Sequence, residues 1–271
     1  MKTLLTVLAA ALALAAPSAL AASASATPTA TSFAALGDSI TRGFDTCTLA
    51  YTDCPANSWA TGTNVSVGSW YLRLHGQNPV LADNNDAKTG ATMADLPGQA
   101  ATAVGQGADL VAILMGANDV CTSTVSSMTS TAVLGGELAQ ALTTLTNGNS
   151  TRQIYVASIP NVYNLWSIFH NNLAANLVWG VAGICQSLLA NPRSTKAADV
   201  ARRAQVQART VADNTEIQAV CAQFPQCHFD HGAAYNVAFT TADVTTRDYF
   251  HPSGSGQAKA AAATWSAFFG S

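Results

Sequence analysis

The sequence has few charged residues. Asp, Glu, Lys and Arg make up only 10% of its 271 residues, and the formal net charge is −3. Nucleic acids and anionic membranes are attracted by a basic field, and this chain does not have one. Hydrophobic residues make up 49% of the chain, which is ample for a large core. The composition therefore indicates a globular protein whose partner is not a nucleic acid.

Long apolar runs are also scarce. The longest begins after Met1-Lys2-Thr3 and is too short to span a bilayer comfortably, since a spanning helix needs ~20 apolar residues. A positive charge, an apolar stretch and small residues at Ala19-Leu20-Ala21 are typical of a secretory signal peptide. We expect a signal peptide at 1–21, a disordered leader at 22–31 and one domain at 32–271. An extracellular monomer without a membrane span follows from this interpretation.

The sequence contains no C-x-x-C spacing, although it has six cysteines. A zinc site is therefore not favoured, and we expect no metal or other cofactor. An even number of cysteines after a signal peptide is typical of disulfides, and six cysteines allow 15 pairings. We favour pairing between neighbours, which joins Cys47 to Cys54, Cys121 to Cys185 and Cys221 to Cys227.

Short apolar runs alternate with helix-like stretches along the chain. Strands are predicted at 33–36, 78–83, 109–115, 153–159 and 226–231, and helices at 93–104, 128–146, 195–223 and 255–269. This alternation favours an α/β fold, a three-layer α/β/α sandwich in which helices cover both faces of a parallel sheet. An uncharged segment at 173–190 is either a buried helix or a wall that contacts an apolar ligand.

Polar residues follow the predicted strands. Gly37-Asp38-Ser39 follow the first strand, a loop with Gly90 follows the second, and Gly116-Ala117-Asn118-Asp119 follow the third. Asp248-Tyr249-Phe250-His251 stand near the end of the chain. Ligands of parallel α/β sheets bind beyond the carboxyl ends of the strands, so these segments are expected to meet there.

The four segments, in this order, resemble the sequence blocks of the SGNH (GDSL) hydrolases, and the match covers essentially the whole predicted domain. The first block reads GDSI instead of GDSL, which exchanges one apolar residue for another. The length and the six cysteines are most similar to the secreted actinobacterial esterases and lipases of this family. The resemblance implies a flavodoxin-like fold and a catalytic triad of Ser39, His251 and Asp248. It also implies an oxyanion hole formed by Ser39, Gly90 and Asn118.

The residue types support the same roles independently. A serine hydroxyl needs an adjacent base, an imidazole can accept its proton, and a carboxylate can orient the imidazole. Asp248 lies three residues before His251 and can reach it from the same loop. Glycine at position 90 permits close approach of the backbone to a substrate, and the side-chain amide of Asn118 can donate to an oxyanion.

Each of these residues also has a structural interpretation. Ser39 and Asn118 could be helix caps, and Gly90 could be an ordinary turn residue. We interpret Asp38 and Asp119 as structural carboxylates of the loops. His228 and His231 are rivals of His251, but a structural role at a strand end suits them better.

The sequence favours a secreted serine ester hydrolase that cleaves lipid or short-chain acyl esters through an acyl-enzyme. A carbohydrate esterase with the same triad is the alternative, and a non-catalytic binding module is a third possibility. The segment 162–190 is expected to form one wall of the acyl site. Its predicted substrate-binding residues are Leu165, Trp166 and Trp179.

Overall fold

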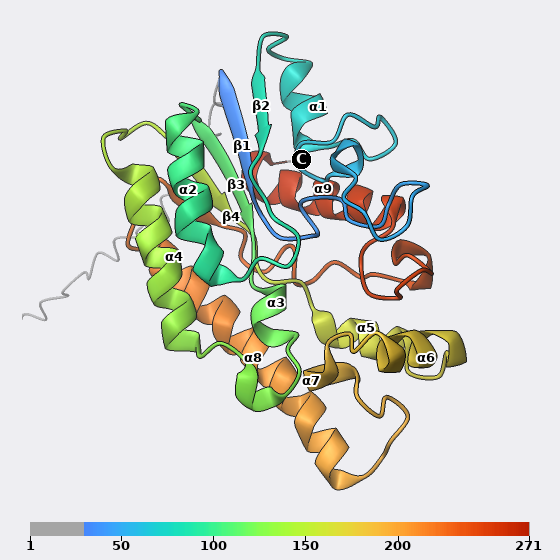
Figure 1. The fold of residues 1–271 in the computed structure, drawn as a ribbon. Coiled ribbons are helices and arrows are strands. Elements are labelled where there is room, and N and C mark those ends of the chain that lie inside the picture. Colours follow the sequence, from blue (N-terminus) through green and yellow to red (C-terminus); the bar gives the residue numbers. More distant parts are fainter. Residues whose placement is uncertain (1–29, 271) are drawn as a thin grey trace, which may run out of the picture.

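The computed structural model describes residues 30–270 and contains a five-stranded parallel sheet (Figure 1). The strands are β1 (Ser32–Gly37), β2 (Ala82–Asn85), β3 (Leu110–Leu114), β4 (Gln153–Val156) and β5 (Cys227–Phe229). Their order in the sheet is β2-β1-β3-β4-β5, and every neighbouring pair is parallel. The predicted fold class, a parallel sheet between helical layers, is confirmed.

Helices cover both faces of the sheet. They are α1 (Trp70–His75), α2 (Leu96–Gly105), α3 (Ala117–Val120), α4 (Thr131–Thr146), α5 (Val162–Phe169), α6 (Leu173–Val181), α7 (Gln186–Leu189), α8 (Ala197–Cys221) and α9 (Gly254–Phe269). Short 3₁₀ turns lie at Pro55–Asn57, Met93–Asp95, Val125–Ser127 and Thr241–Asp243. Helices α2, α4 and α8 pack on one face, whereas α1 and α9 pack on the other.

Alternation along the strands produces the two cores, because successive side chains point to opposite faces of a sheet. In β1, Ala34 and Leu36 join the core beneath α2, α4 and α8, and Phe33 and Ala35 join the core beneath α1 and α9. A third apolar cluster lies beyond the carboxyl ends of the strands and packs α3, α5, α6 and α7 together. This third cluster adjoins the predicted site.

Two predicted elements differ from the structure. The second strand is β2 at Ala82–Asn85, because the apolar residues before it form a turn in which the Leu81 N–H donates to the carbonyl of Asn78. The predicted segment 173–190 is not one helix but two, α6 and α7. Gly183 and Cys185 between them have φ values of +64° and +44°, which a continuing helix does not allow.

The three disulfides follow the predicted pairing of neighbours: Cys47–Cys54, Cys121–Cys185 and Cys221–Cys227. The bond between Cys121 and Cys185 ties the end of α3 to the start of α7.

The expected signal peptide at 1–21 and most of the expected leader lie outside the described residues. Two residues assigned to the leader do contact the sheet: Ala30 is buried, and the Thr31 N–H donates to Asp109. Across residues 30–270, we find no helix with the length and hydropathy that a membrane span requires.

Candidate active site

Ser39 lies immediately beyond the carboxyl end of β1, and the sharp turn there depends on Gly37. Gly37 has a φ of +153°, and a Cβ at this position would lie 2.4 Å from the carbonyl oxygen of Leu114 on β3. Only glycine fits so close to the neighbouring strand. The chain therefore leaves the sheet between Gly37 and Ser39, and the Ser39 side chain faces the carboxyl edge.

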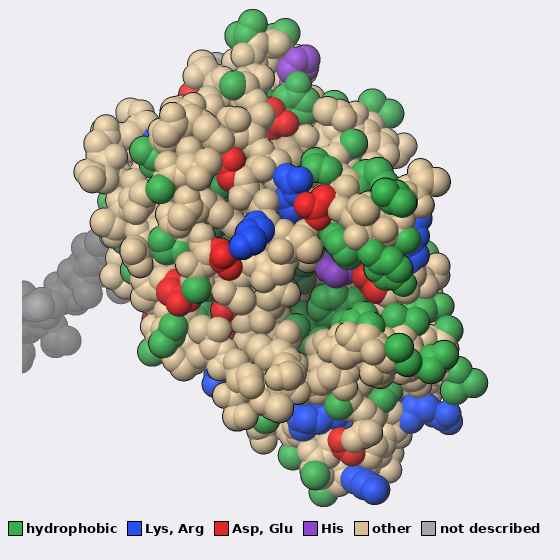
Figure 2. Space-filling view, viewed as in Figure 1, with side chains coloured by type: hydrophobic (Ala, Val, Ile, Leu, Met, Phe, Trp, Pro, Cys, Tyr) green, Lys and Arg blue, Asp and Glu red, His purple; other side chains and the backbone are tan. Residues whose placement is uncertain are grey.

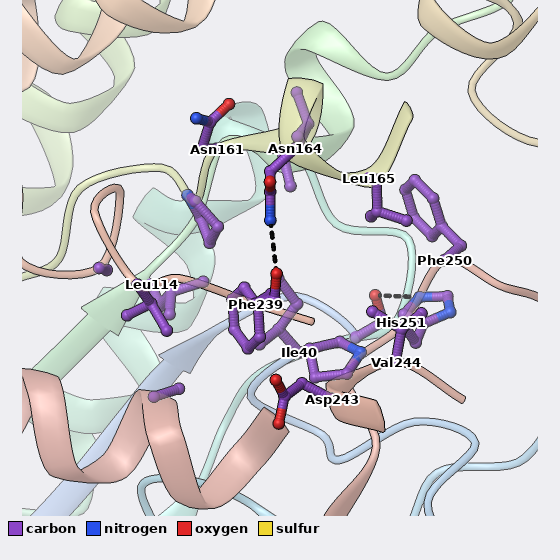
Figure 3. A pocket seen from close by; sticks show the side chains of 18 of the residues that line it. Ile40, Leu114, Asn161, Asn164, Leu165, Phe239, Asp243, Val244, Phe250 and His251 are labelled. Carbon is purple, nitrogen blue, oxygen red and sulfur yellow. Dashed lines mark hydrogen bonds between the residues drawn. The ribbon is translucent and has the colours of Figure 1, made fainter. Parts of the chain in front are cut away.

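The structure brings the three predicted triad residues together. Ser39 Oγ lies 2.8 Å from His251 Nε2 (Figure 3). On the other side of the ring, His251 Nδ1 lies 2.6 Å from Asp248 Oδ2. With the ring proton on Nδ1, the imidazole donates to Asp248 and accepts from the serine hydroxyl. This is the arrangement in which histidine can act as a base toward the serine.

The loop around Asp248 holds this carboxylate in its ionised form. Asp248 Oδ1 accepts from the backbone N–H groups of Phe250 and His251, at 2.8 and 3.0 Å. Burial opposes ionisation, but these bonds and the bond from the His251 ring together lower the pKa of Asp248 below its ordinary value. Asp248 can therefore keep its negative charge next to an imidazolium.

Asn118 and the loop of Gly90 are joined directly. The Asn118 side-chain amide donates to the carbonyl of Ala91 at 2.8 Å, which leaves its second N–H for another acceptor. Gly90 is exposed, has a φ of +82°, and has open space where a Cβ would be. Asn118 lines the same cavity as Ser39 and His251, whereas Gly90 lies outside its lining.

This cavity encloses about 800 Å³, including the part that is open to solvent. One side is formed by α5 with Val162, Leu165 and Ile168. The opposite side comes from the chain segment that leads to His251. Figure 3 shows Leu165 and Phe250 beside His251, and Ile40 and Phe239 among the other side chains that line the cavity. The lining is largely apolar, and its few polar groups include Asn161, Asn164 and Asp243.

A family model described as "GDSL-like Lipase/Acylhydrolase family" matches residues 35–259. The match covers most of the chain and contains the triad residues, Gly90 and Asn118. The chain belongs to the GDSL-like lipase/acylhydrolase family. Membership supports a carboxylic ester hydrolase as the general class of this protein. No curated protein sequence matches the chain at a significant level.

Solved structures share the fold of this GDSL-family chain at low sequence identity. The hydrolase LAE5 from the metagenome of Lake Arreo, Spain, is 17% identical, with a TM-score of 0.52 over 88% of this chain and 94% of its own. A catalytic mutant of Axe2, an acetylxylan esterase from Geobacillus stearothermophilus, is 14% identical, with a TM-score of 0.53 over 88% and 93%. The lipase Lip_vut3 from a goat rumen metagenome is 14% identical, with a TM-score of 0.53 over 88% and 98%.

The structure corrects the expected position of two tryptophans in this GDSL-family chain. The Arg203 guanidinium lies 4.6 Å from the centroid of the Trp166 ring, and Trp166 Nε1 donates to the carbonyl of Pro192. Trp179 is completely buried and donates to the carbonyl of Tyr249. Neither lines the cavity, because both point into the apolar cluster behind the wall. Only Leu165 of the three predicted wall residues faces the cavity.

The remaining titratable residues singled out in the sequence are not members of the triad, although Asp38 directly precedes Ser39. His228 pairs with Gln153 at 2.9 Å, and His231 does not line the cavity. Asp38 and Asp119 are buried in the loops, where they accept from the backbone N–H groups of Ile40 and Met93. Burial raises the pKa of Asp38 to about 6.

Sequence reasoning missed the cavity side formed by Val237, Phe239, Val244 and Phe250. These apolar residues precede or lie within the last sequence block. Their position in the chain beside His251 was the available signal. Within residues 30–270, no three His, Cys, Asp or Glu side chains are grouped so that they could hold a metal ion.

Proposed function

We propose that this protein is a serine ester hydrolase that cleaves carboxylic esters through an acyl-enzyme. The observation that carries the proposal is the continuous chain of contacts from Ser39 Oγ to His251 and on to Asp248, at 2.8 and 2.6 Å. Each contact lies within hydrogen-bond reach for a nucleophile, its base and the group that orients the base.

In the proposed reaction, Ser39 Oγ attacks the ester carbonyl carbon while His251 Nε2 takes the hydroxyl proton. The oxyanion is stabilised by the N–H groups of Ser39 and Gly90 and by the Asn118 amide. His251 then gives its proton to the leaving alcohol, and an acyl-Ser39 remains. Water attacks this ester while His251 takes a proton from the water. The bond between the acyl carbon and Ser39 Oγ then breaks, His251 returns the proton to Ser39 Oγ, and the acid is released.

The substrate class that we propose is a lipid or short-chain acyl ester. The apolar lining of the cavity supports it, because burial of an acyl chain contributes ~0.8 kcal/mol for each methylene. A carbohydrate esterase is the second candidate. It is supported by the likeness of the fold to an acetylxylan esterase and by the side chain of Asn161, which lines the cavity. A non-catalytic binding module is disfavoured because every block keeps its reactive residue.

We also propose an extracellular location and a monomer. The signal-like sequence at 1–21 and the three disulfides support export, since disulfides persist in oxidising compartments. The same disulfides support the likeness to secreted actinobacterial members of the family.

Replacement of Ser39 with Ala tests the proposal. We expect ester hydrolysis to fall by several orders of magnitude, because the nucleophile is lost, while the circular dichroism spectrum stays that of the wild type. The assay is a panel of p-nitrophenyl esters, a phospholipid and an acetylated xylan. Retention of more than about a tenth of the wild-type rate would refute the role of Ser39. Preference for the xylan would favour the carbohydrate esterase.

A further inference from the structure

Helix α6 carries a row of exposed aliphatic side chains. Leu173, Leu177 and Val181 are four residues apart and therefore lie on one face of the helix, and they are 70%, 67% and 82% exposed. We call these three residues the α6 stripe. Single exposed apolar residues are ordinary on protein surfaces, but a contiguous row marks an interaction site.

The opposite face of α6 holds the helix against the loop of the triad. Ala175 and Trp179 point away from the stripe and are completely buried, and Trp179 Nε1 donates to the carbonyl of Tyr249 at 3.1 Å. Tyr249 lies between Asp248 and His251. The α6 stripe is therefore the outer surface of a helix that is bonded directly to the triad loop.

A second exposed apolar group is bonded to the same loop. Leu49 and Tyr51 are 71% and 62% exposed, and the Tyr51 hydroxyl donates to the carbonyl of Arg247 at 3.3 Å. The disulfide between Cys47 and Cys54 closes the segment that carries them. Figure 2 shows hydrophobic side chains around a hollow on this face and on the lobe below it, where Figure 1 places α5 and α6.

The lobe of α5, α6 and α7 also lacks charge. Residues 153–192 contain no Asp, Glu, Lys or Arg. The side chains of this lobe, including the α6 stripe, can therefore be removed from water without desolvating an ionised side chain of their own. Both exposed groups are bonded to the triad loop, so a protein partner that covered them would also cover this loop. A surface made of substrate would instead bring the ester to the triad.

We propose that the α6 stripe, together with Leu49 and Tyr51, docks this protein on the surface of an aggregated lipid ester, such as a vesicle or an emulsion droplet. The inference rests on the proposed ester hydrolysis at Ser39 and extends it to a substrate presented at an interface. The acyl chain then passes from the aggregate into the apolar cavity without crossing bulk water.

The test measures binding without hydrolysis. The Ser39→Ala protein is mixed with phosphatidylcholine vesicles and separated by flotation. We expect the added substitutions Leu173→Ser, Leu177→Ser and Val181→Ser to weaken binding by roughly tenfold or more, because insertion of aliphatic side chains drives association with a neutral bilayer. The matched control carries Val65→Ser, Val80→Ser and Val133→Ser, whose valines are 83%, 83% and 52% exposed. We expect its binding to change by less than about twofold, since surface valines away from the interface contribute little.

The same substitutions with Ser39 intact give the second measurement. We expect slower hydrolysis of emulsified tributyrin and an unchanged rate with dissolved p-nitrophenyl acetate. Leu49→Ser, on a separate segment, should also weaken vesicle binding. This variant replaces the triple variant in the test if the triple variant does not fold.

Vesicle binding by the triple variant equal to that of the control would overturn the docking surface. A wild-type dimer that the triple variant converts into a monomer in sedimentation analysis would also overturn it, because the stripe would then bind a second copy. Either result leaves ester hydrolysis at Ser39 standing, whereas failure of the Ser39→Ala test would remove the proposed function itself.

Discussion

Two adjacent side chains, Asn118 and Asp119, form hydrogen bonds to the loop that carries Gly90. Asn118 donates to the carbonyl of Ala91, and Asp119 Oδ2 accepts from the Met93 N–H at 2.9 Å. Asp119 is 1% exposed, so its bond to the loop is shielded from water. The two bonds fix the loop relative to the short helix α3, and with it the N–H of Gly90.

Asp119 is therefore predicted to be a positioning residue of the oxyanion hole. We expect Asp119→Ala to lower kcat by roughly 10- to 100-fold with little change in KM, because oxyanion donors act mainly on the transition state. Steady-state kinetics with a dissolved p-nitrophenyl ester measure both constants.

Asp119→Asn is the control, because its side-chain oxygen can still accept from the Met93 N–H. It should recover most of the lost kcat. If Asp119 had a purely structural role, the Ala variant would be less stable, but its kcat would not fall selectively while KM stayed nearly unchanged. Equal changes in the two constants would therefore contradict the positioning role.

At the scale of single elements, the sequence predicted the five strands and the four longest helices, α2, α4, α8 and α9, but not the shorter helices between them. The apolar runs of β1, β3 and β4 are unambiguous because these strands are covered on both faces. Edge strand β2 reads ADNN and is mostly half-buried, so hydrophobicity placed it a few residues early. The break between α6 and α7 lies at Cys185, whose bond to Cys121 spans 64 residues.

The triad residues could be predicted from the sequence, whereas the orientation of the two tryptophans could not. Ser39, Asn118 and His251 could be placed because the carboxyl ends of parallel strands meet at one edge of the sheet. The orientation of Trp166 and Trp179 could not, because it depends on partners far away in the sequence, Arg203 and Tyr249. An uncharged segment shows which residues avoid water but not which of them face a ligand.

Helix α5 supplies a test of the acyl wall. Leu165 faces the cavity, whereas its neighbour Trp166 packs away from it. Leu165→Asn should slow hydrolysis of p-nitrophenyl octanoate by roughly tenfold and that of the acetate by less than about twofold, because only the longer chain loses contacts worth ~0.8 kcal/mol per methylene. The ratio of kcat/KM for the two esters is the measurement.

Trp166→Leu is the matched variant. It should affect both esters to a similar extent, since this side chain supports the helix from behind. If Leu165→Asn also slowed both esters equally, α5 would not select for chain length.

For the whole molecule, buried carboxyl groups determine how stability responds to pH. Burial raises the pKa of Asp38 and Asp213 to about 6 and that of Asp83 to about 7. Hydrogen bonds from Ser194 and Asn191 lower the pKa of Asp199 to about 2. Burial also opposes the ionisation of Asp243, but bonds from Lys259 and Thr240 lower its pKa to about 2. The carboxyl groups with raised pKa values and those with lowered pKa values therefore have opposite effects on how the free energy of unfolding changes with pH.

The sign of the expected pH dependence follows from proton counts. Between the ordinary pKa of 3.8 and about 6 to 7, Asp38, Asp83 and Asp213 keep their protons in the native state and lose them on unfolding. Stability falls with rising pH wherever the native state binds more protons. Below the ordinary pKa, Asp199 and Asp243 reverse the trend. We therefore expect the free energy of unfolding to decrease from about pH 4 to pH 7.

Asp213 provides the single-site test of this pH dependence. It is completely buried between α8 and α4 and accepts from the Thr131 hydroxyl at 2.6 Å, and its second oxygen has no hydrogen-bond partner among residues 30–270. An amide can keep the bond from Thr131 and carries no charge at any pH. Relative to the wild type, Asp213→Asn should therefore gain about 1–3 kcal/mol in free energy of unfolding between pH 4 and pH 8. Urea unfolding at several pH values measures the difference, and parallel curves for the two proteins would show that Asp213 is already ionised in the native state at pH 4.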